Sequence, residues 1–309
     1  MRRGISPDTS WHLQKLILIL TQRLSSAEIS AMIQDSTVAT VVALAMFSCM
    51  INDHAGAKAH LSGLQQMVRL RGGIEGFDRN IILQLKLGRV DLVYAINTGS
   101  DGLLCTHPIL YSPLFYELGT LSSYTTTYHD PSIYGASDIR ILTIFREMQN
   151  YSCLISHAQQ TQQRRPESEY LAAICSFQYR LLQLQGLVND RISECLRLAM
   201  LAFLVTTFQF PGVRARYPYL ADQLREWCHA LNVKGCTKLQ ELMRWILIVG
   251  AISVFDLEAE TEQWMGEKWR ISVDAGWEEV RMQLRQIMWI DALQDTIGQT
   301  AFIELSTRR

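Results

Sequence analysis

The hydrophobic and polar positions of this chain follow the period of an α-helix in one segment after another. Apolar residues recur every three or four positions, and the strict alternation typical of half-buried strands is nearly absent. Asp101-Gly102 is the one candidate for a hairpin turn, and its flanks do not alternate. The pattern predicts an all-α fold of about ten helices. We place them within residues 1–24 and near 25–50, 54–71, 79–97, 139–157, 167–187, 190–208, 219–231, 237–257, 261–270 and 274–293.

Two stretches set the predicted organisation of the chain. Residues 1–24 are expected to form an N-terminal helical extension with four apolar residues in helical register: Leu13, Leu16, Ile17 and Leu20. Between residues 99 and 137 the periodicity stops, and a segment this long could divide two subdomains. Because apolar helices flank it on both sides, the preferred interpretation is a single large, irregular multi-helix domain over residues 25–309.

The most informative stretch is His54 to Gly76, which reads HAGAKAHLSGLQQMVRLRGGIEG. Helical spacing gathers its apolar residues on one face: Ala57, Leu61, Leu64, Met67 and Val68. Asp53 is placed to cap the first turn, and Gly72-Gly73 can end the helix in a left-handed conformation without steric cost. We therefore expect Leu64 in the core and a positive φ at Gly73. These features predict a packed, well-capped helix and no chemistry.

The letters HLSGLQQMVRLRGG within that stretch resemble the signature helix of the fungal-specific transcription factor domain, the regulatory region that follows a zinc binuclear cluster. Later segments are similar to that family in the same order: residues 196–201, 242–251, 264–269, 277–280 and 287–291. The resemblance runs from about residue 25 to the C-terminus. It implies a nuclear, non-enzymatic regulator that acts through protein contacts or a small effector. Members of this family often control metabolic or secondary-metabolite genes.

Charge bears on direct DNA binding. Lys plus Arg is 29 against 30 for Asp plus Glu, which leaves a net charge of -1. A module that grips DNA needs a basic face to neutralise phosphates. The compact basic pairs are few, and two of them are terminal: Arg2-Arg3, Arg164-Arg165 and Arg308-Arg309. We therefore expect no strong direct DNA binding by this chain.

The cysteines indicate that the zinc cluster itself is missing. None of the seven has the two-residue spacing that lets neighbouring thiolates share one ion. Cys228 and Cys236, with His229 between them, are the nearest approach to a ligand set, whereas Cys49, Cys175 and Cys195 are expected to be small buried hydrophobes. No metal ligand and no cofactor are predicted. This leaves either a shortened gene model or a regulator that works through protein partners, as a homodimer or paired with a zinc-cluster transcription factor.

Residues of catalytic type are present without a catalytic frame. Ser193, His229 and Asp222 are the types found in hydrolases, but no strand-turn-helix presents a nucleophile. His54 and His60 are six residues apart and lie on different helical faces. We predict no catalytic residue and a protein that is not an enzyme. The alternative is an α-helical enzyme or small-ligand-binding protein with a pocket under residues 99–137.

Two further expectations concern membranes and partner surfaces. Thr37–Ile51 is uncharged but only fifteen residues long, and Leu242–Phe255 is shorter and contains Arg244. Both fall short of the roughly 20 apolar residues needed to cross a bilayer, so no membrane contact is expected. Tryptophan is common at binding hot spots. Four tryptophans near the C-terminus are therefore either a contact surface for partners or, by the simpler interpretation, core: Trp264, Trp269, Trp277 and Trp289.

Overall fold

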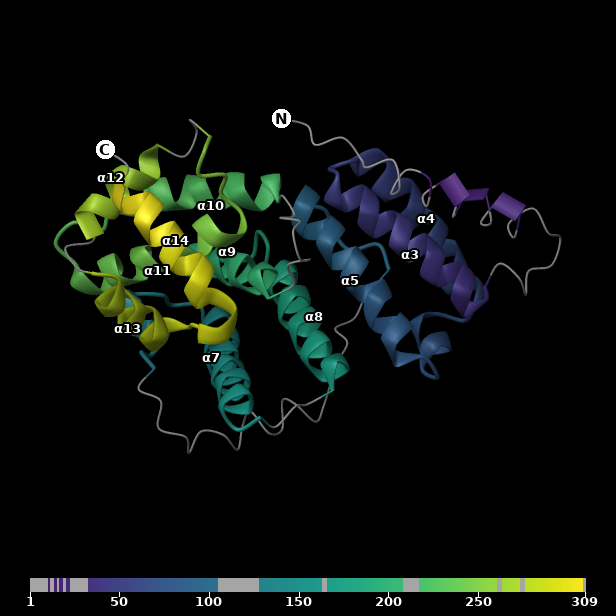
Figure 1. Ribbon diagram of the computed structural model, residues 1–309, viewed down its shortest axis with the longest axis horizontal. Coiled ribbons are helices and arrows are strands. Elements are labelled where there is room, and N and C mark those ends of the chain that lie inside the picture. The colour runs from purple at the N-terminus through teal and green to yellow at the C-terminus, as the bar shows by residue number, and fades with distance from the viewer. Residues whose placement is uncertain are drawn as a thin grey trace. The chain divides into compact units, whose positions relative to one another are not determined.

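The structure, a computed structural model, describes residues 33–104, 128–162, 166–207, 217–259, 263–272 and 276–307, with positions 11, 14, 15, 17, 18, 21 and 22. All regular structure in these ranges is helical, which confirms the all-α prediction (Figure 1). Eleven α-helices are described: α3 Asp35–Met50, α4 His54–Leu70, α5 Ile81–Thr98, α7 Ile139–Gln160, α8 Glu167–Gln183, α9 Arg191–Thr206, α10 Pro218–Ala230, α11 Thr237–Ser253, α12 Trp264–Ser272, α13 Trp277–Ile287 and α14 Asp291–Thr307. The short 3-10 helices η1 (Ile74–Phe77) and η3 (Pro131–Tyr134) join them.

Several predictions fall on other parts of the chain. The three basic pairs, Cys105 and residues 105–127 of the irregular segment lie outside the described residues. Within the described ranges, no helix is long and apolar enough to cross a membrane.

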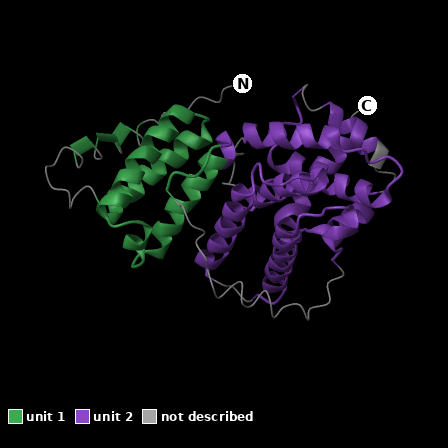
Figure 2. Cartoon of the chain, turned by 180° about the vertical axis from the view of Figure 1, so that it is seen from behind, with its two compact units in different colours: residues 1–95, 100–107 green, residues 96–99, 108–309 purple. Residues whose placement is uncertain are grey.

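The fold separates into two compact units, shown in different colours in Figure 2. Unit 1 comprises residues 1–95 and 100–107, and unit 2 comprises residues 96–99 and 108–309. The change from one unit to the other falls at the start of the segment where the sequence allows a division into subdomains.

Unit 1 is built on the pairing of α3 with α4, the predicted signature helix. The Asp53 carboxylate caps α4 by accepting from the Gly56 amide at 3.0 Å. The apolar face predicted for α4 is the face it buries, and Leu64 is fully buried. Gly72 and Gly73 have φ of 91° and 101°, so the helix ends where left-handed backbone is free of steric cost. All these expectations are confirmed.

Unit 2 is organised around α9 and α11. From Ser193 to Thr206 and from Leu242 to Ser253 every residue is buried, and the remaining helices of the unit pack around these two. Trp245 on α11 is fully buried and lies 6.0 Å from the Phe145 ring and 6.2 Å from the Phe203 ring. This is a packed helical core of the kind that consecutive apolar residues favour.

Two helix predictions differ most from the structure. The helix expected from residue 25 begins at Asp35, because the two preceding residues form a turn and a bend. The helix expected over 274–293 is two helices, α13 and α14, with α14 reaching Thr307. The chain leaves helical geometry at Met288, with φ -173° and ψ 115°. The Ile290 amide then donates to the Gln294 side chain at 2.9 Å. This break lets three consecutive residues, 288–290, all be buried.

Candidate functional site

The C-terminal end of α4 is held by a clasp of four side chains: Asp35, Arg71, Phe77 and Asn80. Arg71 pairs with the Asp35 carboxylate, and its Nε donates to the Gly76 carbonyl oxygen at 2.9 Å. Its guanidinium carbon lies 4.1 Å from the centroid of the Phe77 ring, a cation–π distance. The clasp therefore joins the start of α3, the end of α4 and η1 through one guanidinium group.

Asp35 completes the clasp from the other side. It accepts from the Asn80 side-chain amide at 2.6 Å, and Asn80 in turn accepts from the Leu83 amide at 3.2 Å at the start of α5. The hydrogen bond from Asn80, followed by that from Arg71, lowers the pKa of Asp35 below its ordinary value. The side chains of Asp35, Arg71 and Asn80 therefore satisfy one another's hydrogen-bonding groups. Their role is to position the helices that they join.

A second anchor attaches the chain after α5 to unit 1. Asp91, only 1% exposed, accepts from the Leu103 amide at 2.7 Å and the Leu104 amide at 3.0 Å. Gln65, on the signature helix, donates to the Leu103 carbonyl oxygen at 2.8 Å. The observed role depends on residues that a sequence pattern does not connect.

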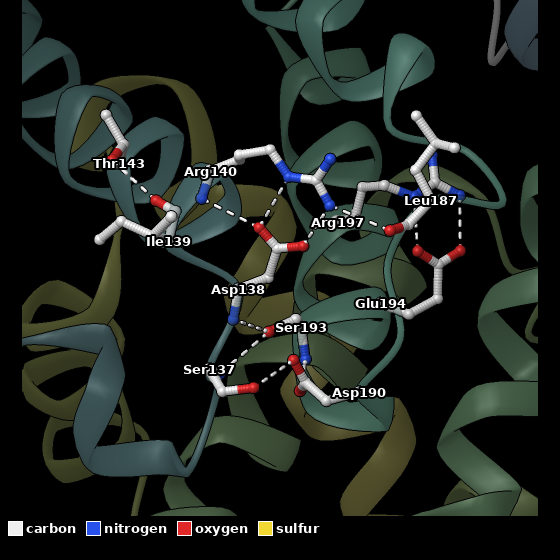
Figure 3. A network of polar contacts seen from close by, with 10 residues as sticks. All are labelled: Ser137, Asp138, Ile139, Arg140, Thr143, Leu187, Asp190, Ser193, Glu194 and Arg197. Carbon is white, nitrogen blue, oxygen red and sulfur yellow. Dashed lines mark hydrogen bonds and ion pairs between the residues drawn. The ribbon is translucent and has the colours of Figure 1, made fainter.

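Ser193, the serine of the hydrolase-type set, works as a hydrogen-bond acceptor between two helix starts. Its Oγ accepts from the amides of Ser137 at 3.2 Å and Asp138 at 3.1 Å (Figure 3). Asp190, the N-cap of α9, accepts from the Ser193 amide at 2.7 Å and the Ser137 hydroxyl at 2.9 Å. Burial raises the pKa of Asp190, but the hydrogen bonds from Ser193 and Ser137 outweigh this and leave it lowered. The network fixes the starts of α7 and α9.

Beside Ser193 lies a buried ion pair, also visible in Figure 3. Glu194 and Arg197 are joined by two hydrogen bonds of 2.7 Å, and Arg197 also donates to the Leu181 carbonyl oxygen at 3.2 Å. Their exposed fractions are 7% and 2%. The other members of the hydrolase-type set have different partners: His229 packs on Trp264 with ring centroids 4.8 Å apart, and Asp222 pairs with Arg225 at 2.7 Å.

One titratable cluster is not evident from the sequence. The Nδ1 atom of His129 lies 3.2 Å from the Tyr134 hydroxyl and 3.7 Å from a Glu241 carboxylate oxygen. Glu241 also pairs with Lys238 at 2.7 Å. Burial, and then the charge of Lys238, lower the pKa of His129 below its ordinary value of 6.5, whereas Glu241 opposes this. The side chains come from the loop before η3, from η3 and from α11, so local sequence spacing gives no signal for them.

The structure also shows how far the two cysteines nearest in sequence and the four C-terminal tryptophans are buried. Cys228 is fully buried and Cys236 is exposed. No group of three or more His, Cys, Asp or Glu side chains with the geometry of a metal site occurs in the part of the chain that the structure describes. Trp264, Trp269 and Trp289 are 9%, 2% and 2% exposed, and Trp277 is half-buried. Three of the four therefore belong to the core.

Comparisons with protein-family models, with curated proteins and with solved structures found no match to this chain.

Proposed function

We propose that this chain is a non-enzymatic transcription-regulator-like protein of the nucleus that acts by contacting other regulators, among them a zinc-cluster transcription factor. The proposal starts from the resemblance of residues 54–76 to the signature helix of the fungal-specific transcription factor domain. Such a domain can act at a promoter by pairing with a protein that binds DNA, or by occupying that partner unproductively.

One observation carries the proposal. The signature residues are used together: Leu64 is buried, Gly73 ends the helix, and Arg71 ties that end to its neighbours. A chance match between unrelated amphipathic helices would require only the apolar face. Here the polar and glycine positions of the matched letters have specific roles as well, which supports a shared structural unit.

The test combines location, capture and promoter occupancy of the full chain in cells of its source organism. We expect a tagged chain in nuclei, cross-linked capture of a zinc-cluster transcription factor, and occupancy of promoters that is lost when that partner is deleted. Leu64→Ala should reduce capture because it loosens the signature helix, whereas Ser62→Ala, at an exposed position of the same helix, should not.

Three results would contradict the proposal. The first is a tagged protein excluded from nuclei, and the second is capture that recovers no transcription factor. The third is a gel shift in which the purified chain alone binds a promoter fragment at sub-micromolar concentration and physiological salt, because partner-dependent action would then be unnecessary.

A further inference from the structure

The backbone of His129 is fixed between two helices of unit 2. Its amide donates to the carbonyl oxygen of Gln286, near the end of α13, at 2.8 Å. Its carbonyl oxygen accepts from the Gln149 side chain of α7 at 3.0 Å. Gln149, only 4% exposed, also donates to the Ile287 carbonyl oxygen at 2.8 Å. Because the backbone is held in this way, any response of His129 to protonation falls to its ring.

The ring of His129 faces two groups that suit opposite protonation states. Its Nδ1 atom lies 3.2 Å from the Tyr134 hydroxyl on η3 and 3.7 Å from the Oε2 atom of Glu241 on α11. Burial, and then the charge of Glu241, raise the pKa of Tyr134, so its hydroxyl remains a donor. A donor suits a neutral ring nitrogen, whereas a carboxylate only accepts and suits a protonated one. Since 3.2 Å is within hydrogen-bond range and 3.7 Å is beyond it, the observed arrangement is that of the neutral ring.

The Oε2 atom of Glu241 is already held by another cation. Lys238 lies 2.7 Å from it, and the two side chains are 42% and 13% exposed. Arg244, about one turn further along α11, donates to Gln283. A second positive charge beside Oε2 would therefore compete with Lys238, whose ammonium group is the more exposed and the more easily returned to water.

Other charged groups close to the ring in the chain or on α13 have partners of their own. Asp130, the next residue, pairs with Arg146 of α7 at 2.9 Å. On α13, Arg285 pairs with Asp291. Burial raises the pKa of Tyr128, the preceding residue, which keeps that hydroxyl neutral. The local charges that respond to protonation of the ring are therefore those of α11.

We propose that His129 is a pH-sensitive switch, which holds η3 through Tyr134 when neutral and holds α11 through Glu241 when protonated. The ring is 22% exposed, so a proton can reach Nδ1 from solvent. Nδ1 then changes from acceptor to donor, and its N–H closes on the carboxylate in a charge-assisted hydrogen bond. Tyr134 loses its acceptor, and Lys238 is displaced towards solvent. Acidification therefore loosens η3 and frees the ammonium group at the start of α11.

The pKa of His129 in matched variants tests the exchange of partners. Proton–carbon NMR of the full chain, labelled at the histidine Cε1 atoms, follows it, and loss of one signal in His129→Gln identifies the ring. Tyr134→Phe should raise this pKa by about 0.5 to 1, because only the neutral ring loses a hydrogen bond. Glu241→Gln should lower it by about 1, because the protonated ring loses its acceptor. Lys238→Met should raise it by removing a like charge. Tyr219→Phe, which removes a hydroxyl bonded to a glutamine elsewhere in unit 2, should leave it unchanged.

The sign of the change in Tyr134→Phe decides between two acid forms. If the pKa falls or stays the same, the protonated ring keeps Tyr134 as its partner, and the exchange is wrong. If Glu241→Gln leaves the pKa unchanged, Glu241 is not the acceptor. Nitrogen NMR that places the proton of the neutral ring on Nδ1 would also overturn the switch, because Nδ1 could not then accept from Tyr134. If one variant gives the signals of an unfolded chain, the other substitution and the nitrogen spectrum of the wild type decide.

Discussion

Leu64 provides the sharpest test of the signature helix, because α4 contains its own control. Leu64 is fully buried, whereas Leu70 on the same helix is 51% exposed. Removing a buried leucine side chain costs the transfer free energy of the lost carbons plus that of the cavity, about 2–5 kcal/mol of unfolding free energy. Leu70→Ala should change stability by no more than about 0.5 kcal/mol.

The measurement must report on unit 1. Of the seven tryptophans only Trp11 belongs to unit 1, so tryptophan fluorescence follows mainly unit 2. Native-state hydrogen exchange of the core amides of α4 and α5 reads the opening free energy of unit 1 directly. A loss of 2–5 kcal/mol corresponds to exchange that is about 30- to 5,000-fold faster in Leu64→Ala.

Two results would refute this reasoning. If Leu64→Ala and Leu70→Ala accelerate exchange equally, the buried face assigned to α4 is wrong. If neither variant changes exchange, α4 contributes little to the core of unit 1. Amides of α9, which belongs to unit 2, serve as the internal reference for solution conditions.

Four further predictions concern two glycines, a histidine and a buried ion pair. Gly99→Ala should destabilise unit 2 by more than about 1 kcal/mol in a thermal melt, because its φ is +71° and a Cβ there would overlap a tyrosine ring. Gly63→Ala, with open space around it in α4, should stabilise by about 0.5–1 kcal/mol. Because the pKa of His129 is lower in the folded protein than its ordinary value of 6.5, protonation of His129 disfavours the folded state. The urea midpoint of unfolding should therefore fall as the pH drops below 6.5, and it should fall less in the His129→Gln variant. Glu194→Ala should cost about 3–5 kcal/mol of unfolding free energy, because it leaves the buried Arg197 guanidinium without its carboxylate. The double variant Glu194→Leu with Arg197→Met should recover most of that loss. Urea unfolding monitored by tryptophan fluorescence measures both. Equal losses in the single and double variants would contradict it.

Where local rules decide the structure, sequence reasoning is sufficient. The cap at Asp53 and the stop at Gly73 follow from side-chain and backbone preferences within a few residues. The break between α13 and α14 does not follow from such local preferences. It depends on burying residues 288–290 together and on Gln294 accepting from the Ile290 amide, and both require the folded core. Periodicity alone therefore joins the two helices into one.

The polar anchors show the same division. A positive charge such as Arg71 is favoured near the C-terminal end of a helix, but its contacts with Asp35 and Phe77 join segments that only the fold brings together. The buried carboxylate of Asp91 accepts backbone amides twelve and thirteen residues later, which no local sequence rule indicates. A buried carboxylate needs such donors to offset desolvation. The sequence shows which residues carry a charge, whereas only the structure shows which groups pair with each of them.

The C-terminal tryptophans illustrate how burial decides between two functions of one residue type. Tryptophan is frequent both in cores and at binding hot spots. The Trp289 indole N–H donates to Asp295 at 2.8 Å, and the Trp269 indole N–H donates to Ser306 at 3.2 Å. Rings that are packed and hydrogen-bonded in this way stabilise the fold of their own chain. Their substitution would therefore weaken the binding of a partner only by destabilising that fold. A direct contact surface is better sought where apolar side chains are exposed.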